Sequence, residues 1–276
     1  PHDGTYLTDG DRMVHIDFKA LTGRRVMIYG QTEVTEDLYA AQDAMGTTIL
    51  HGVEDVVIED LDAAQASVSF TVEGARRTLT CAYVAGCDGF HGVSRKTIPE
   101  AKRQEFERVY PFGWLGILSR TPPVHDELIY ANSEHGFALA SMRNPNLVRY
   151  YVQVPLSDKV EDWSDDRFWT EFKRRIPAQA AAALVTGPSI EKSIAPLRSF
   201  VSEPLRWGRL LLLGDAAHIV PPTGAKGLNL AFSDVHYASE ALIAALTHGS
   251  TAGIDGYSAR ALQRIWKAMR FSWQMT

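Results

Sequence analysis

The sequence lacks two features that would suggest a nucleic-acid-binding or membrane protein. Its 276 residues include 28 Lys and Arg against 33 Asp and Glu, a net charge of −5, whereas a protein that neutralises phosphates normally has a basic surplus. Apolar runs such as Leu210 to Leu213 fall far short of the roughly 20 residues that a membrane-spanning helix needs. We therefore expect no nucleic-acid partner and no membrane span.

Cysteine is also scarce, which excludes most sites and cross-links that depend on it. The chain has 2 cysteines, Cys81 and Cys87, and their spacing matches no common zinc or redox motif. We expect no metal site and no disulfide framework, and a reducing cytoplasm is the default compartment. The N-terminal Pro-His-Asp-Gly segment lacks a basic and apolar leader, so no signal peptide is expected.

The composition is otherwise typical of a folded enzyme of one large or two modest domains. Hydrophobic residues make up 45% of the chain and charged residues 22%, which excludes global disorder. A hairpin is predicted around Asp9-Gly10, and Thr32 can cap a helix that extends to Met45. Short apolar stretches between turn residues predict strands over residues 26–29, 56–58, 68–72, 77–81 and 83–85.

The middle of the chain predicts a second domain with an antiparallel sheet. Its strands alternate with turns rich in Pro and Asn, and they are expected over residues 113–119, 127–130, 137–142 and 149–154. Helices over 163–176 and 177–185 and an extended segment over 194–201 follow. The apolar run Leu210 to Leu213 is typical of a buried parallel strand, and two helices come after it, over 228–248 and through Met269.

The stretch from Gly214 to Asn229 is the most informative part of the sequence. Asp215 follows a buried strand, and a carboxylate at that edge of an α/β sheet is well placed to accept hydrogen bonds from ribosyl or ribityl hydroxyls. The glycines allow close approach to a flat ring, and the following helix directs free N–H groups at negative charge. Gly-Asp alone is a common turn, but this sixteen-residue combination favours a flavin site.

A second candidate stretch runs from Ala85 to Arg95. A strand leads into Asp88-Gly89, and Ser94 and Arg95 follow, so a carboxylate, flexible backbone and a cation come close together. Such a group could bind the pyrophosphate and sugar of a dinucleotide. On its own, an Asp-Gly pair is more often only a turn.

These motifs carry a resemblance to a known family. The Gly-Cys-Asp-Gly-Phe-His-Gly and Gly-Asp-Ala-Ala-His-Ile-Val-Pro-Pro-Thr-Gly stretches, in this order and separation, resemble those of the single-component FAD-dependent aromatic hydroxylases, and the likeness extends over nearly the whole chain. The resemblance implies that the full-length protein is an enzyme that uses FAD and NADPH, whereas an isolated fragment of it could be inactive. It also implies that one oxygen atom of O₂ is inserted beside the phenol hydroxyl of 4-hydroxybenzoate through a C4a-hydroperoxyflavin, which gives 3,4-dihydroxybenzoate.

The resemblance also implies roles for particular residues. The residues implied to hold FAD are Gln31, Asp88, Asp215, Gly227, Leu228 and Asn229, with Arg149 influencing flavin position. NADPH is assigned to His91 and Arg95, because its phosphates require cations. Without the surrounding motif, His91 would be interpreted as an exposed turn histidine and Arg149 as a surface cation.

Substrate-binding residues are implied in the same way. The benzoate carboxylate is assigned to Ser141, Arg143 and Tyr151, and a planar guanidinium suits a carboxylate. Ser141 and Arg143 share one face of a strand by alternation, although such a pair is more often a solvated face. The phenol is assigned to Tyr130 and the Pro222 carbonyl, with Thr223 nearby and His2 as the outer histidine of a proton relay.

The expected fold is a mixed α/β (α+β) fold with a Rossmann-like FAD-binding domain. The expected division is a partial FAD-binding domain over 1–109, a substrate-binding sheet domain over 110–198, a return to the FAD-binding domain over 199–232 and a helical region over 233–276. The family's G-x-G-x-x-G loop is not present, so the sequence is expected to be a fragment that lacks the first βαβ unit and ends before the family's C-terminal helix.

Two alternatives remain open from the sequence. The chain could be a related hydroxylase of another phenolic acid, which the presence of all four implied substrate residues disfavours, or a non-catalytic flavin-fold fragment. The family also suggests a homodimer, while the choice between NADPH and NADH is left undecided. The expected partner is otherwise a small aromatic acid.

Overall fold

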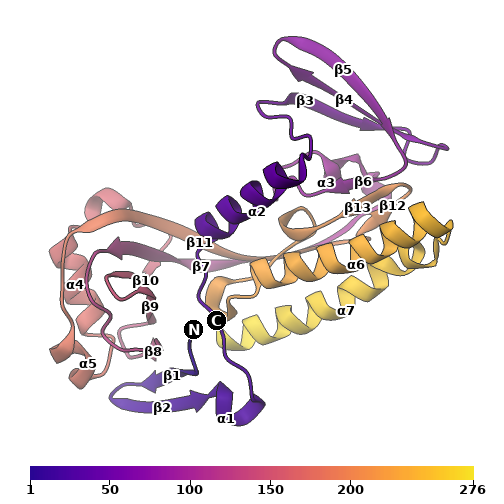
Figure 1. The fold of residues 1–276 in the computed structure, drawn as a ribbon. Helices are drawn as coiled ribbons and strands as arrows, with labels where there is room; N and C mark the ends of the chain where they lie inside the picture. The colour runs from indigo at the N-terminus through magenta and orange to yellow at the C-terminus, as the bar shows by residue number, and fades with distance from the viewer. The chain divides into compact units, whose positions relative to one another are not determined.

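The computed structural model describes residues 1–276 and divides the chain into two compact units. The first unit contains Pro1–Thr47 and Tyr110–Leu197, and the second contains Thr48–Val109 and Arg198–Thr276. The chain therefore passes from the first unit to the second, returns to the first, and ends in the second. Figure 1 follows this path by colour from the N-terminus to the C-terminus.

The first unit is built around a mixed sheet. Its strands are β1 (Gly4–Asp9), β2 (Arg12–Asp17), β7 (Gln104–Ser119), β8 (Leu128–Asn132), β9 (Ala138–Asn144), β10 (Leu147–Pro155) and β11 (Ser189–Glu203), in the order β11-β7-β10-β9-β8-β1-β2. Neighbours from β7 to β8 pair antiparallel, which confirms the predicted antiparallel sheet. The hairpin of β1 and β2 extends this sheet because β1 pairs with β8 in parallel.

Alternation along β10 gives the sheet two different faces. Its even-numbered residues from 148 to 154 are buried, whereas the odd-numbered residues between them are only partly buried. The buried side packs against α4 (Asp165–Lys173), where the rings of Trp169 and Phe172 lie 5.1 and 5.0 Å from the ring of Tyr150. The helix thus covers one face, and the polar and aromatic residues of β10 project from the other.

The second unit combines a small parallel pair with a separate antiparallel sheet. β12 (Arg206–Trp207), β13 (Leu210–Leu212) and β6 (Val84–Gly86) form one sheet, in which β13 and β6 are parallel. β3 (Glu54–Glu59), β4 (Ala66–Val72) and β5 (Ala75–Cys81) form the other. β14 (His218–Ile219) pairs with Phe200 and Val201, the part of β11 that belongs to this unit.

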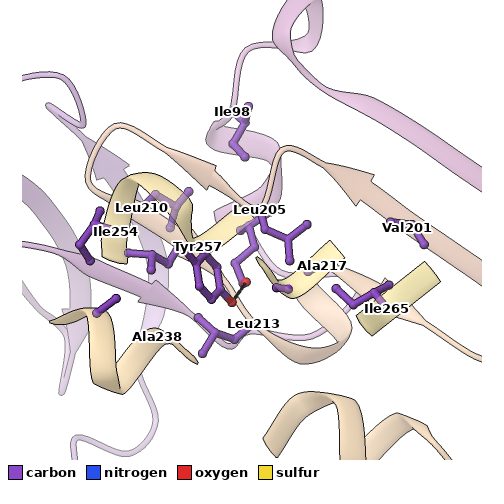
Figure 2. Packing of buried hydrophobic residues seen from close by; sticks show 14 of the residues in the cluster. Ile98, Val201, Leu205, Leu210, Leu213, Ala217, Ala238, Ile254, Tyr257 and Ile265 are labelled. Atoms are coloured by element: carbon purple, nitrogen blue, oxygen red, sulfur yellow. Dashed lines mark hydrogen bonds between the residues drawn. The ribbon is translucent and has the colours of Figure 1, made fainter. Parts of the chain in front are cut away.

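Two long helices supply the core of the second unit. They are α6 (Gly227–His248) and α7 (Ala252–Met275), and α7 buries Ile254, Tyr257, Ala261, Ile265 and Met269 at helical spacing. Figure 2 shows Tyr257 near Leu210 of β13 and Leu213, and its hydroxyl donates to the Leu212 carbonyl at 2.8 Å. Each such large apolar side chain contributes roughly 1.5–3 kcal/mol when fully buried. This core supports the end of β13, where Asp215 follows.

Short helices complete the chain. They are α1 (Phe18–Thr22), α2 (Gln31–Met45), α3 (Ser94–Thr97) and α5 (Ala178–Ala183), with 3-10 turns at Glu100–Lys102, Val160–Asp162, Gly214–Ala216 and Pro222–Gly224. No helix is long and apolar enough to cross a membrane.

Three details of the N-terminal segment differ from the sequence-based expectations. The predicted strand over residues 26–29 is reduced to one bridge between Val26 and His2. The helix predicted near Thr32 is present, but its N-cap is Gly30. Residues 1–47 group with 110–197 instead of with 48–109, because β1 pairs with β8. Strand pairing between segments distant in sequence cannot be predicted from local patterns.

Candidate active site

The Asp215 carboxylate lies at the carboxyl end of β13. Gly214 has a φ of +59°, and Gly214–Ala216 forms a 3-10 turn. Asp215 is exposed while both of its neighbours are buried, and its side chain makes no ion pair or hydrogen bond. Desolvation by the surrounding protein raises the pKa of Asp215. The carboxylate is free to accept hydrogen bonds from ligand hydroxyls.

The loop after this turn is ordered by its own hydrogen bonds and leads into α6. Ala225 donates its N–H to the Pro222 carbonyl at 2.9 Å, and Asn229 Nδ2 donates to the Ala225 carbonyl at 2.8 Å. The helix begins at Gly227 without a side-chain cap, so the N–H groups of its first turn are free. The dipole of this helix of 22 residues also places its positive end at the same N-terminal turn.

The remaining predicted residues of this loop differ in exposure. Pro222, Leu228 and Asn229 are exposed, whereas Thr223 is buried with its Oγ1 2.7 Å from Thr276 Oγ1. A Cβ at Gly227 would meet no atom within 4 Å, so the backbone there borders open space. The Pro222 carbonyl accepts one hydrogen bond within the loop and keeps a second lone pair for a ligand.

The Asp88 carboxylate orders its own loop in the second unit. Its Oδ2 accepts the Ser94 N–H at 2.8 Å, and a Cβ at Gly92 would come within 2.2 Å of the same oxygen. Gly89 has a φ of +71°, a conformation that favours glycine. The Asp-Gly pair is therefore part of a tight turn, as its sequence alone suggested, and the second carboxylate oxygen is left free.

Arg95 links this loop to the Asp215 turn. The side chain is buried, Nη1 donates to the Ala216 carbonyl at 3.0 Å, and Nη2 donates to the Phe90 carbonyl at 2.7 Å. Its Nε lies 3.2 Å from Glu105 Oε1, so all three guanidinium nitrogens contact protein groups. His91 differs because it is exposed. The assignment of Arg95 to NADPH stays a prediction. In the structure, its hydrogen bonds connect the two loops and stabilise their arrangement.

In the first unit, the strand register brings Tyr130, Ser141 and Tyr151 onto one face of the sheet, whereas Arg143 lies at a β-bulge and has no opposite residue on β10. Leu139 of β9 lies opposite Tyr130 of β8 on one side and Tyr151 of β10 on the other. Ser141 lies opposite Arg149 in the same way. Residues directly opposite each other on neighbouring strands point to the same side. The structure therefore gathers these side chains on the face that α4 does not cover.

This face is aromatic around the tyrosines and polar farther along β9. The ring of Trp114 lies 4.8 Å from that of Phe137 and 5.5 Å from that of Tyr151. Burial, followed by the proximity of Tyr151, raises the pKa of Tyr130. Ser141 is buried, whereas Arg143, two residues on, is exposed and makes no ion pair. The free guanidinium is therefore available to an anionic ligand.

Arg149 is held on the same face by residues of β11. Its Nη1 lies 2.7 Å from Glu191 Oε1, and its Nη2 donates to Ser193 Oγ at 3.3 Å. The guanidinium lies 5.5 Å from the Tyr151 ring centroid. Glu191 was not identified from the sequence, because no local pattern links it to a residue 42 positions earlier in the chain. These contacts distinguish Arg149 from an unattached surface cation.

His2 is buried beside the start of β8. Its Nδ1 lies 2.9 Å from Glu127 Oε2, and Oε1 of the same carboxylate accepts the N–H groups of Asp3 and Gly4 at 2.8 and 3.1 Å. Thr5 Oγ1 also donates to the Leu128 carbonyl at 3.2 Å. Glu127, three residues before Tyr130, is a further residue that sequence reasoning missed. It anchors the N-terminal segment to the strand that carries Tyr130.

The predicted residues thus form two groups, one in each unit. The first unit contains His2, Gln31, Tyr130, Ser141, Arg143, Arg149 and Tyr151, and the second contains Asp88, His91, Arg95, Asp215, Pro222, Thr223, Gly227, Leu228 and Asn229. Gln31 is exposed at the first position of α2 and contacts none of the other predicted residues of its unit.

The second group fits FAD. A free carboxylate at the end of β13 suits sugar hydroxyls, the uncapped N-terminus of α6 suits negative charge, and Gly227 leaves room for a flat ring. No group of three or more His, Cys, Asp or Glu side chains could hold a metal ion. The donor set is that of a nucleotide cofactor.

Comparison with known proteins identifies the family of the chain. The FAD binding domain family matches residues 1–272. The chain is 56% identical to p-hydroxybenzoate hydroxylase of Acinetobacter baylyi, over 100% of this chain and 68% of that protein. It is 29% identical to para-nitrophenol 4-monooxygenase of a Pseudomonas species, over 75% of this chain and 51% of that protein.

A solved structure shares the fold. The p-nitrophenol 4-monooxygenase of Pseudomonas putida matches 98% of this chain and 70% of its own, with a TM-score of 0.81 at 18% identity. This likeness concerns the fold, while the sequence matches extend over the motifs that form the Asp215 turn and the Asp88 loop. The chain belongs to the FAD-binding family of flavin-dependent aromatic hydroxylases.

Proposed function

We propose that the protein hydroxylates 4-hydroxybenzoate to 3,4-dihydroxybenzoate with NADPH and O₂. One oxygen atom of O₂ enters the ring carbon beside the phenol oxygen, the other leaves as water, and NADPH is oxidised to NADP⁺ with uptake of a proton. The observation that carries the proposal is the sheet face on which Tyr130, Tyr151 and Ser141 gather, with the guanidinium of Arg143, free of ion pairs, at the bulge that follows Ser141. The 56% identity to the Acinetobacter enzyme supports the same substrate.

Recognition of the acid is assigned to the polar end of this face. A guanidinium can donate two parallel hydrogen bonds to a carboxylate, and Arg143 has no protein carboxylate as a partner. The hydroxyl of Ser141 can donate a further hydrogen bond to the same carboxylate.

The phenol is assigned to Tyr130. Because its pKa is raised by burial and by Tyr151, Tyr130 keeps its proton and can donate it in a hydrogen bond to the substrate oxygen. This bond stabilises the ionised phenol, in which the neighbouring ring carbon is richer in electrons and a better nucleophile. His2 donates its Nδ1 proton to Glu127 in the tautomer that this contact favours, so its Nε2 is the atom left to accept a proton.

The cofactor-binding residues proposed here come from the second group, and the assignment of Gln31 to FAD stays a prediction. When bound, FAD supplies hydride acceptance from NADPH and the activation of O₂. Asp215 binds sugar hydroxyls, and the N–H groups of Gly227, Leu228 and Asn229 stabilise negative charge on the ring. For NADPH we propose the surface at His91, where the exposed Lys96 adds a cation and donates from Nζ to the His91 carbonyl at 3.3 Å.

The proposal is tested with FAD-loaded protein. NADPH and O₂ consumption are measured with 4-hydroxybenzoate, and the product is identified by chromatography against 3,4-dihydroxybenzoate. We expect one product molecule for each NADPH consumed. Stoichiometric hydrogen peroxide without hydroxylated product would overturn the hydroxylase assignment. The same assay with NADH measures the coenzyme preference.

A substrate panel distinguishes the alternatives. A hydroxylase of another phenolic acid would give coupled turnover with that acid and not with 4-hydroxybenzoate, whereas a non-catalytic flavin-binding protein would give none with any acid. We propose a reducing compartment such as the cytoplasm, which the low cysteine count favours. Family resemblance supports a homodimer, which light scattering of the FAD-loaded protein can test.

A further inference from the structure

A buried acid–imidazole pair lies beneath the Asp215 turn and is not used by the proposed chemistry. His218 Nε2 is 2.6 Å from Asp234 Oδ2, and both side chains are 1% exposed. Asp234 lies on the inner side of α6, and His218 lies on β14. Two ionisable groups that are buried to this extent are costly unless they satisfy each other. The presence of this pair in the core therefore indicates a role other than filling space.

The same carboxylate oxygen also holds the backbone before Asp215. Gly214 donates its N–H to Asp234 Oδ2 at 3.0 Å, so the residue preceding Asp215 and the residue three positions after it are both bonded to one atom. Within the turn, Ala217 donates to the Gly214 carbonyl at 2.8 Å. Asp215 is thus the exposed residue of a turn, and the residues on both sides of it are hydrogen-bonded to the buried Asp234 carboxylate.

The geometry also indicates the proton arrangement of the pair. His218 Nδ1 is buried and has no hydrogen-bond partner, so the ring proton belongs on Nε2, facing Asp234. Asp234 then accepts two N–H donors, as a buried carboxylate requires. The pKa of Tyr257 is raised mainly by burial and in addition by the negative charge of Asp234. The carboxylate therefore also acts on a group outside the pair. Figure 2 shows Tyr257 beside Leu213, the residue that precedes the turn.

We propose that Asp234, through His218 and the Gly214 amide, is a positioning residue that aims the Asp215 carboxylate at the bound flavin nucleotide. The inference rests on the flavin site of the proposed function and deepens it. Asp234 itself does not contact the cofactor. Its effect on FAD affinity therefore operates through Asp215, and this gives the proposal a signature that a purely structural role would not have.

The test is a double-mutant cycle on FAD affinity, measured by flavin fluorescence with the whole protein. Asp234→Asn keeps the shape of the side chain but removes its charge and one acceptor. We expect it to weaken FAD binding by about tenfold or more, close to the loss in Asp215→Ala. In the Asp215→Ala background, Asp234→Asn should add less than about threefold, because contacting residues that act as a unit are not additive. Glu240→Gln, which removes an exposed acid of the same helix, is the matched control.

Each outcome decides the inference. An unchanged FAD affinity in Asp234→Asn, or a full tenfold loss in both backgrounds, would overturn it, because the residue would then be irrelevant or would act on stability alone. If Asp234→Asn fails to fold, His218→Phe takes its place in the same cycle, since a ring remains there but can no longer donate to Asp234. Failure of the wild-type protein to bind FAD would contradict the flavin site itself and not the role of Asp234.

Discussion

Tyr130 and Tyr151 lie on the two strands that flank β9, each opposite Leu139 and on the same face of the sheet. Burial and the proximity of Tyr151 together raise the pKa of Tyr130. A tyrosine with a raised pKa stays neutral, so it can donate a hydrogen bond to a phenolate and does not place a second negative charge beside it. The relationship connects the register of three strands directly to the chemistry proposed for the site.

Tyr130→Phe should uncouple NADPH oxidation from hydroxylation. The variant keeps the ring but removes the hydrogen bond to the substrate oxygen, so flavin reduction should persist with some slowing, while oxygen leaves as peroxide. The measurement is product formed per NADPH consumed at saturating 4-hydroxybenzoate. Tyr150→Phe is the control, because Tyr150 is buried on the opposite face of β10 and should stay coupled. A fully coupled Tyr130→Phe variant would make Tyr130 a packing residue.

Arg143→Ala should weaken binding of 4-hydroxybenzoate and leave FAD affinity unchanged. Hydrogen bonds to a charged group are worth roughly 1.5–3 kcal/mol, which corresponds to about 10- to 150-fold in the dissociation constant. Titration of the FAD-loaded protein with 4-hydroxybenzoate measures this dissociation constant. Arg120→Ala, at an exposed position after β7, serves as the control. A change of less than about threefold would exclude Arg143 as the carboxylate anchor.

Glu127→Ala should lower the free energy of unfolding by about 1–3 kcal/mol, because donors from His2, Asp3 and Gly4 would lose their acceptor. Urea unfolding followed by circular dichroism measures this, with Glu134→Ala as an exposed control on the following turn. If both variants unfold at the same urea concentration as the wild type, the carboxylate does not anchor the N-terminal segment.

Asp165 should make stability depend on pH in the acid range. Burial raises its pKa, but hydrogen bonds from Lys192 and Ser189 outweigh this effect and lower the pKa to about 2 from the usual 3.8. Because the folded-state value is the lower one, the stabilisation is present above about pH 4 and is lost as the pH falls towards 2. Because Asp165 is partly exposed to solvent, we expect its ionised form to contribute about 1–2 kcal/mol to the free energy of unfolding.

The measurement for this prediction compares Asp165→Asn with the wild type at pH 6 and near pH 2.5. The difference in unfolding free energy should be present at pH 6 and should shrink towards the lower pH. Asp166→Asn removes an exposed acid of the same helical turn and should show little difference at either pH. A constant difference across the range would mean that Asp165 does not titrate as described.

Local patterns predicted most of the elements. Alternation marked the strands of the antiparallel sheet, and the apolar run before Gly214 marked β13, because the side-chain period of a strand is visible in the sequence. The same patterns misplaced the N-cap of α2 and predicted a strand over residues 26–29, where competing local signals are weak. The motif from Gly214 to Asn229 marked the turn and loop between β13 and α6, to which we assign the flavin, because the spacing of its Asp and Gly residues is a property of the chain alone.

The sequence by itself therefore determined which residue types line the site and which stretches carry them. The tertiary structure decided which partners they meet: Glu127 for His2, Glu191 for Arg149, and Asp234 for His218. It also decided that the guanidinium of Arg95 is buried between two loops and that Tyr130 and Tyr151 share a face. These pairings join residues far apart along the chain, and their register depends on packing of whole strands and helices, which no local pattern encodes.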